Sequence, residues 1–354
     1  MTLHQLNPNP NGFVRSMRKV YKPLGFSKGY NAVLWFIFLG ALFGFGLARA
    51  MYLNINGTFR THAGPGEWFY YSMPFYKAAI TLHLASVVPA CLLAVIQFTP
   101  VIRYKAITVH RVNGYVLILL VTLANISALM IARHAFGGTL STQAFVGTFA
   151  IFTEGSLFLS YWNIKRLQIE QHRAWMLRCW AYLGTIITVR LISPIASIII
   201  GKLGGYFMAI KCEQLAFAAG PDVAASFTNC QADPHGWAVV EGSLYNPTGL
   251  AEVIAAFQLT FGMACWVALT LHAVGVELYL NLTPAEAERL RHVSYERQLE
   301  RGLTPAGSAG LTVDKLGDAA PWSPTPKKDM AEQRTSESDI SVVMPAVHVK
   351  ADGA

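Results

Sequence analysis

The sequence is short of charge: Asp, Glu, Lys and Arg make up 14% of its 354 residues, whereas hydrophobic residues make up 53%. Soluble domains usually carry about 25% charged residues, so this deficit argues against a water-soluble fold. The chain also lacks the short motifs of common soluble enzymes. It has no Walker loop, no GxGxxG that leads into a helix and no HExxH. We therefore expect any chemistry to lie within an apolar fold or at its faces.

Six long apolar runs dominate the chain. A run of 18 or more apolar residues can cross a bilayer as a helix, because hydrocarbon forces every backbone polar group to find a partner within the segment. None of the runs alternates as the strands of a membrane barrel do. They cover residues 31–48, 78–98, 112–132, 144–163, 179–201 and 251–280. The sequence therefore predicts an all-α polytopic membrane helix bundle with six transmembrane helices.

The distribution of Lys and Arg predicts the orientation of this bundle. Cytosolic segments next to membrane helices carry an excess of basic residues. Sixteen such residues lie before the first run, after the last run and in two of the loops, against six in the other loops. Both termini are therefore predicted to be cytosolic, in the endomembrane system or the plasma membrane. The net charge of +8 is explained by this topology and gives no reason to expect nucleic acid.

Two features of the predicted lumenal side agree with this orientation. Residues 56–58 read Asn-Gly-Thr, which predicts glycosylation at Asn56. Cys212 and Cys230 both fall in the long loop 202–250, and disulfides persist on that side of the membrane. The other three cysteines fall within the apolar runs, so Cys212 and Cys230 are predicted to form a disulfide.

The boundaries of the membrane domain follow from the same runs. Residues 1–30 are predicted to be a cytosolic segment, and residues 31–280 the membrane domain with the lumenal loop 202–250. Residues 281–302 are charged and predict a cytosolic amphipathic helix. The remainder, 303–354, is rich in Pro, Ser, Gly and charge, and it is predicted to be disordered because it has little apolar surface to bury.

Histidines near the ends of the helices suggest a cofactor. The predicted topology sorts four of them into an outer pair and an inner pair. Two pairs at two depths are how a helix bundle would hold two haems, of the haem b type, with two imidazole ligands each. Arginines beside the inner pair would bind the haem propionates, although the same residues also fit simple anchoring at the interface. The outer pair is His83 and His134, the inner pair is His110 and His172, and the arginines are Arg111 and Arg173.

Other ionisable residues lie deeper in the runs. Glu154 and Arg190 fall at similar predicted depths, and two opposite charges in hydrocarbon are expected to pair. Such a pair either fixes the register of two helices or belongs to a catalytic cavity. His272, in the last run, is a further candidate for the same cavity.

Three segments of the sequence carry a resemblance to known proteins: "ITLHLASVVPACLLAVIQF", "HRVNGYVLILLVTLANISALMIARHAFGG" and "QHRAWMLRCWAYLGTIITVRLISP". Together they resemble a family of uncharacterised multi-pass membrane proteins of fungi and bacteria, known only as a domain of unknown function. The resemblance brings no activity with it. The paired histidines give the family layout a distant likeness to the cytochrome b561 type of transmembrane electron carrier. Fungal members of such families often look like accessory genes of small-molecule biosynthesis.

Three functions stay open on the sequence alone. The first is a haem-binding transmembrane redox protein, in which haem iron is the only expected metal. The second is a membrane-embedded enzyme of the cyclase or isomerase type, or an accessory protein, acting on a lipophilic metabolite through Glu154, Arg190 and His272. The third is a transporter or scaffold. The predicted partners are the lipid bilayer and a lipophilic small-molecule substrate or an electron donor.

Overall fold

The computed structural model describes residues 11–324 and is almost entirely helical. Six of its helices are long and apolar enough to cross a membrane, which confirms the predicted all-α polytopic bundle. They are α2 (Gly29–Ala50), α5 (Pro74–Phe98), α7 (Ile107–Ile131), α8 (Leu140–Lys165), α9 (Ile169–Leu203) and α13 (Leu250–Asn281). The chain divides into two compact units. Within the described residues, the first unit comprises 11–157 and 176–279, and the second comprises 158–175 and 280–324.

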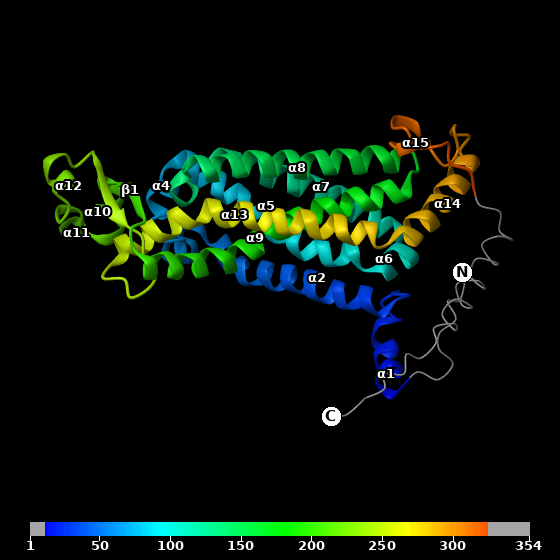
Figure 1. Cartoon of the computed structure of the whole chain (residues 1–354), viewed down its shortest axis with the longest axis horizontal. Coiled ribbons are helices and arrows are strands. Elements are labelled where there is room, and N and C mark those ends of the chain that lie inside the picture. The colour runs from blue at the N-terminus through cyan, green and yellow to red at the C-terminus, as the bar shows by residue number, and fades with distance from the viewer. Residues whose placement is uncertain (1–10, 325–354) are drawn as a thin grey trace, which may run out of the picture. The chain divides into compact units, whose positions relative to one another are not determined.

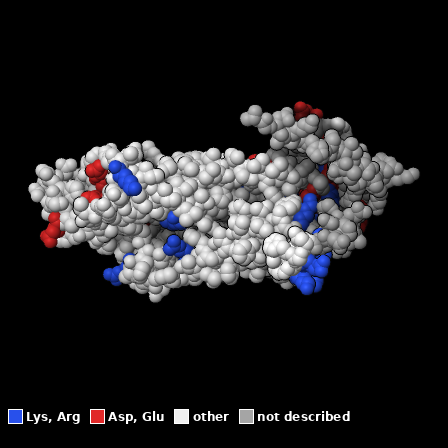
Figure 2. All heavy atoms as spheres, turned by 60° about the horizontal axis from the view of Figure 1, so that its bottom comes forward, with Lys and Arg blue, Asp and Glu red and all other residues white. Residues whose placement is uncertain are grey.

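Large apolar side chains cover the outside of the membrane helices. Phe36, Leu119 and Ile151 are 72%, 60% and 71% exposed. Large apolar patches are rare on soluble monomers, whereas in a bilayer these side chains contact lipid. The face drawn in Figure 2 has broad areas over the helices without Lys, Arg, Asp or Glu, and one group of basic side chains lies in a hollow of that face. The exposed surface of the helices is therefore suited to lipid.

Small residues lie where the helices meet. Ala256, Ala264 and Ala268 of α13 are fully buried. On α2, a Cβ added at Gly46 would lie 2.8 Å from the Cβ of Cys91 on α5. Without a hydrophobic force between helices in lipid, close approach of backbones at small residues supplies much of the attraction. In the first unit α5 lies between α2 and α7 (Figure 1).

Helix α9 is longer than its apolar run. The sequence predicts a span from residue 179, but the helix begins at Ile169. The intervening residues contain no Pro or Gly and include good helix formers, so nothing stops the helix at the edge of the apolar run. Its 35 residues extend over roughly 52 Å at 1.5 Å per residue, which exceeds the hydrocarbon thickness of a bilayer.

A small disulfide-bonded element follows α9, at the end of the bundle where α13 begins (Figure 1). Its members are β1 (Phe207–Lys211), α10 (Cys212–Ala219), α11 (Pro221–Ala225), α12 (Thr228–Ala232) and β2 (Trp237–Glu241). The two strands pair antiparallel. Cys212 and Cys230, predicted to pair, are joined by a disulfide with Cα atoms 5.5 Å apart. Leu215 of this element packs against Ile254 of α13, so the element is part of the first unit.

The connection between α2 and α5 folds into short helical turns. They are η1 (Met51–Leu53), η2 (Ile55–Phe59), α3 (Arg60–His62) and α4 (Trp68–Tyr71). Phe59 and Tyr71 are buried in one cluster with Ile80 of α5 and Ile131 of α7, so this connection is packed on the bundle. Asn56 is exposed in this connection. Its glycosylation stays a prediction.

The second unit contains α14 (Pro284–Glu300), α15 (Val313–Leu316) and the adjoining ends of α8 and α9. Gln168 and Gln298 are fully buried there, and Gln298 Nε2 donates to Gln168 Oε1 at 2.9 Å. The same oxygen accepts the N–H of Gly310 at 2.9 Å. Residues 303–324 therefore differ from the predicted disorder, because hydrogen bonds to buried glutamines hold a segment that has few large apolar residues. The rest of the predicted disordered tail, 325–354, lies outside the described residues.

Candidate functional site

Glu67, immediately before α4, is a buried carboxyl group at 3% exposure. Both of its oxygens lie 3.0 Å from the backbone nitrogen of Phe136, whose N–H donates to them. The hydroxyl of Tyr71 also forms a hydrogen bond with this carboxyl group. A buried polar group without such partners would be costly, so the two hydrogen bonds are what allow Glu67 to lie inside the fold.

The Phe136 N–H reaches Glu67 because the chain turns sharply after α7. The turn η3 (Ala135–Gly138) has positive φ angles at three successive residues: 46° at Phe136, 78° at Gly137 and 54° at Gly138. Glycine adopts this left-handed backbone at little cost. At Gly138 a Cβ would lie only 1.7 Å from the carbonyl oxygen of Arg133, so no other residue fits. The Phe-Gly-Gly sequence thus builds the turn that holds the Glu67 carboxyl group.

Burial changes the protonation of this site. Desolvation raises the pKa of Glu67 to about 8, although the hydrogen bonds from Phe136 and Tyr71 and the positive charge of Arg190 act to lower it. Burial, together with the charge of Glu67, also raises the pKa of Tyr71 well above its usual value. Glu67 is therefore mostly neutral at pH 7, which leaves it with a proton to donate.

Arg190 of α9 is the cation next to this acid. Its guanidinium lies 5.2 Å from the ring centre of Phe136 and 5.8 Å from that of Phe261 on α13. These two rings are stacked, with centres 4.1 Å apart and planes 13° from parallel. Arg190 is exposed, whereas Glu67 is buried. Ionisable residues within membrane helices are costly and are usually retained for function, so the cation and the neutral acid together form the candidate site.

The predicted outer histidine pair lies beside this site, but its two rings have different neighbours. His83 Nδ1 is 3.1 Å from the carbonyl oxygen of Ala124, and Ser127 Oγ is 3.4 Å from the same nitrogen. His134 is stacked on Tyr70, with ring centres 4.1 Å apart, and it meets the edge of Tyr76. Burial, and then the charge of Arg133, lower the pKa of His134. The two histidine rings therefore have different contacts and share none of these partners.

The predicted inner histidines fall in different units. His110 of α7 lies 3.5 Å from Gln97 Nε2 of α5. His172, in the second unit, lies 2.7 Å from Ser160 Oγ through its Nδ1. Arg111 is exposed, and Arg173 is half-buried in the second unit.

The predicted haem would have to bind to histidines that already contact protein groups in the first unit. The Nδ1 of His83 contacts the carbonyl oxygen of Ala124 on α7, which leaves only the Nε2 of that ring to bind an iron. The internal space beside Gln97 and Gly114, close to His110, measures about 10 Å³ and holds at most a water molecule. Haem binding therefore stays a prediction from the sequence, and the visible absorption spectrum of the purified protein tests it.

Glu154 does not pair with Arg190. Its carboxylate accepts hydrogen bonds from Thr122 Oγ1 at 3.1 Å and from Asn125 Nδ2 at 2.6 Å. The early start of α9 explains the difference from the predicted pair. Arg190 lies about 31 Å along α9 from its start, whereas Glu154 lies about 16 Å from the adjoining end of α8. The two residues therefore sit at different depths, and neutral polar groups satisfy Glu154.

This arrangement predicts that changes at the two positions act independently. We expect the losses in free energy of unfolding caused by Glu154→Gln and Arg190→Leu to add in the double variant within about 0.5 kcal/mol, because the residues share no partner. Thermal and denaturant unfolding of the purified variants in detergent measures this. Recovery of stability in the double variant would instead indicate a direct ion pair.

His272, the third predicted catalytic residue, has a separate environment. Its Nε2 is 2.8 Å from Thr188 Oγ1 of α9, and its ring packs on Gly184, where an added Cβ would lie 3.0 Å from it. Five residues further along α13, Glu277 forms a two-point ion pair with Arg178 at 2.5 and 2.9 Å. The structure thus gives Glu154, Arg190 and His272 three different sets of partners.

Glu67 is absent from the residues predicted from the sequence, because those were ionisable residues in or beside the apolar runs. It lies in the segment "PGEWFYY" at residues 65–71, between two membrane spans. A single acidic residue among aromatic residues was the available signal, because such neighbours exclude water. The partner N–H of Phe136 was not visible in the sequence, since it depends on the η3 turn 69 residues away.

The central part of this chain is similar to a known protein family. Residues 80–212 match the DUF2306 family of predicted membrane proteins. The matched region includes Phe136 and Arg190 but begins after Glu67. The chain is also similar to a protein of Aspergillus versicolor named Ava biosynthesis cluster protein G. The two are 26% identical over 324 residues, which cover 77% of this chain and 94% of that protein. No solved structure matches.

Proposed function

We propose that this integral membrane protein is an enzyme that isomerises or cyclises a lipophilic small molecule by proton transfer, in a pathway of secondary metabolite biosynthesis. The observation that carries the proposal is Glu67, a buried acid with a pKa of about 8, beside the exposed cation Arg190 of a membrane helix. The name of the Aspergillus versicolor relative supports the type of pathway.

The chemistry begins with the neutral form of Glu67. Its proton is transferred to an oxygen atom or a carbon–carbon double bond of the substrate, and the carboxyl group becomes a carboxylate. The N–H of Phe136 and the hydroxyl of Tyr71 already contact this group, and Arg190 supplies positive charge, so the carboxylate forms among groups that stabilise it. No oxidant or reductant takes part.

The cation formed on the substrate then rearranges or closes a ring. Aromatic faces stabilise such a cation through their negative electrostatic potential. The ring of Phe136 and the side chain of Glu67 both pack on Gly64, each about 3 Å from the position of a Cβ there, so an aromatic ring adjoins the acid. Loss of a proton from the cation, returned to the Glu67 carboxylate, gives a product of the same composition and restores the acid.

Arg190 gives the site its access to lipophilic molecules. Arg190 is an exposed residue of a membrane helix, and its guanidinium is held over the rings of Phe136 and Phe261. In this proposal the guanidinium binds a polar group of a substrate that arrives through the lipid. This arrangement favours substrates with a long apolar body and one polar end.

Deletion of the gene tests the proposal. We expect the deletion strain to lose one lipophilic metabolite and to accumulate another of identical elemental composition, because an isomerisation changes no atoms. High-resolution mass spectrometry of the extracts measures both. Re-expression of the wild-type chain should restore the product. An accumulated precursor that differs from the lost product by two hydrogens or by oxygen would contradict an isomerase and favour a redox role.

A further inference from the structure

Helix α1 (Gly12–Tyr21), which precedes the first membrane helix, has two contrasting faces. Phe13, Met17 and Val20 follow the i, i+4, i+7 spacing of one helix face, and they are 71%, 40% and 62% exposed. An exposed apolar stripe next to basic residues is typical of helices that lie in a membrane interface. The basic residues on and just after the opposite face are Arg15, Arg18, Lys19 and Lys22.

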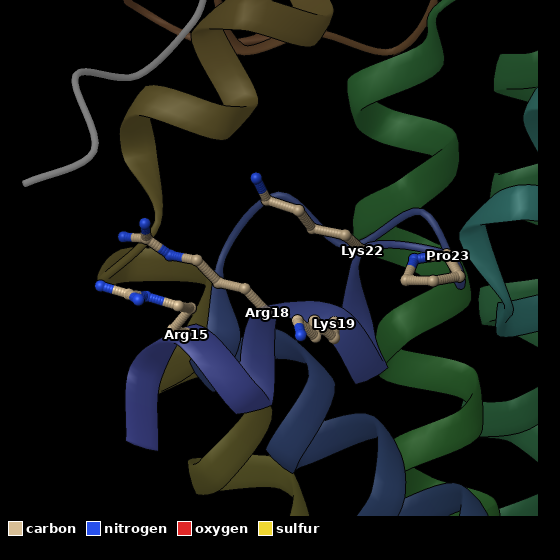
Figure 3. Close-up of a pocket in the computed structure, with 5 residues that line it drawn as sticks. All are labelled: Arg15, Arg18, Lys19, Lys22 and Pro23. Carbon is tan, nitrogen blue, oxygen red and sulfur yellow. The ribbon is translucent and has the colours of Figure 1, made fainter. Parts of the chain in front are cut away.

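The basic side chains line a recess. Together with Pro23 they surround an open space of about 460 Å³ (Figure 3). The side chains of Arg15 and Arg18 point the same way in Figure 3. Within residues 11–324, no Asp or Glu forms an ion pair with any of the four basic residues. In the same part of the chain, the enclosed Nε of Arg18 has no hydrogen-bond partner. The recess therefore offers unneutralised donors to an anion.

The turn after α1 fixes this helix against the bundle. Val101 N–H, in α6 (Pro100–Lys105), donates to the carbonyl oxygen of Leu24 at 3.0 Å. Gly25 has φ +88°, and a Cβ there would lie 2.9 Å from the backbone nitrogen of Val101. Phe26 then packs on Trp35 of α2, with ring centres 5.8 Å apart. The turn thus holds α1 close to the beginning of α2 and the end of α5, where the membrane surface is expected.

We propose that α1 is a binding site for anionic phospholipids. Its apolar face inserts among the acyl chains, and Arg15, Arg18, Lys19 and Lys22 bind the phosphate groups of phosphatidylserine or similar lipids. The predicted orientation places α1 on the cytosolic leaflet, which carries these lipids. Arginine suits this role, because its planar fork of N–H groups binds phosphate oxygens in pairs. The inference does not depend on the proposed isomerase activity.

Hydrogen–deuterium exchange of the full-length protein in nanodiscs tests the site. We expect the amides of residues 12–22 to exchange at least ~10-fold more slowly in discs that contain phosphatidylserine than in discs of phosphatidylcholine alone. Replacing the four basic residues with Gln should abolish this difference. Phe13→Ser should weaken protection in both kinds of disc, because it removes apolar insertion rather than charge.

Two controls decide the interpretation. Arg103→Gln with Lys105→Gln removes two exposed cations of α6 on the same predicted side, and it should leave the lipid-dependent protection of α1 in place. Inorganic phosphate added to phosphatidylcholine discs distinguishes a soluble phosphate site from a lipid site. Equal exchange in the two kinds of disc, protection by inorganic phosphate alone, or full protection in the four-Gln variant would each overturn the proposal.

Discussion

Glu67→Gln is expected to lower product formation by about 10²–10⁴-fold while the amount of protein in the membrane stays close to that of the wild type. A Gln side chain keeps the shape of the neutral acid, and its carbonyl oxygen can still accept the N–H of Phe136. It has no acidic proton to transfer. The measurement is the ratio of product to its isomeric precursor in a deletion strain that expresses the variant, together with immunodetection of the protein in membranes.

The pH dependence of the same reaction has a definite sign. Because the neutral acid is the donor, the rate should be constant well below the pKa of Glu67, about 8, and should fall as the pH rises through that value. The assay uses isolated membranes and the precursor purified from the deletion strain. In Glu67→Gln any residual rate should lack this decline. A wild-type rate that instead rises with pH would show that the group acts as a base.

A matched variant separates the role of Glu67 from a general loss of acidic residues. Glu213→Gln removes an exposed acid from α10, where its partner is the exposed ring of His235. We expect this variant to form product at the wild-type level. Glu67→Ala should, by contrast, reduce the abundance of the protein, because the N–H of Phe136 would lose its partner in a buried position. Wild-type activity in Glu67→Gln would exclude Glu67 as the proton donor.

The difference between the predicted and the observed site has a physical origin. Helix type and number were predictable, because the length and apolarity of a run determine whether it can cross a bilayer. The disulfide of Cys212 was predictable from the predicted lumenal position of its loop and from the small number of cysteines. The depth of a residue in the membrane was not predictable, because it depends on where its helix begins. Helix α9 begins with polar residues that lie outside its apolar run. For that reason the predicted partner of Arg190 was Glu154. Glu67 was missed for a different reason, because it lies outside the apolar runs.

The composition of residues 303–324 predicts disorder, whereas the structure shows an ordered segment. The segment has too little apolar surface for an ordinary core, and that is why it reads as disordered. The structure instead satisfies its backbone with buried side chains: Gln168 Nε2 donates to the carbonyl oxygen of Gly307 at 2.8 Å, and Asn163 Oδ1 accepts the N–H of Leu311 at 2.8 Å. These partners lie more than 130 residues away in the sequence, so no local pattern reveals them.

Arg291→Leu should release this segment at a cost of about 3 kcal/mol in local stability. Arg291 Nη2 lies 2.6 Å from Asp314 Oδ1, and the two side chains are only 14% and 5% exposed. The guanidinium also donates to the carbonyl oxygen of Gly307 at 3.1 Å and to Ser308 Oγ at 2.8 Å. Removal of the guanidinium leaves the Asp314 carboxylate in a buried position without its cation. Hydrogen exchange of residues 303–324 in the full-length protein measures the loss.

The protonation of Asp314 gives this prediction a second, independent readout. Burial raises the pKa of Asp314, but hydrogen bonds from Ser308 and Arg291 outweigh it and hold the pKa below its usual range. Stability from this group is therefore fully present above the usual Asp pKa of about 3.9 and is lost only as the pH falls through the lower folded value. Protection of residues 303–324 should persist from pH 7 to pH 5 in the wild type. Arg297→Gln removes only an exposed pair with Glu300, so it should change protection by less than about 0.5 kcal/mol. Equal exchange in Arg291→Leu and Arg297→Gln would show that the buried pair does not hold the segment.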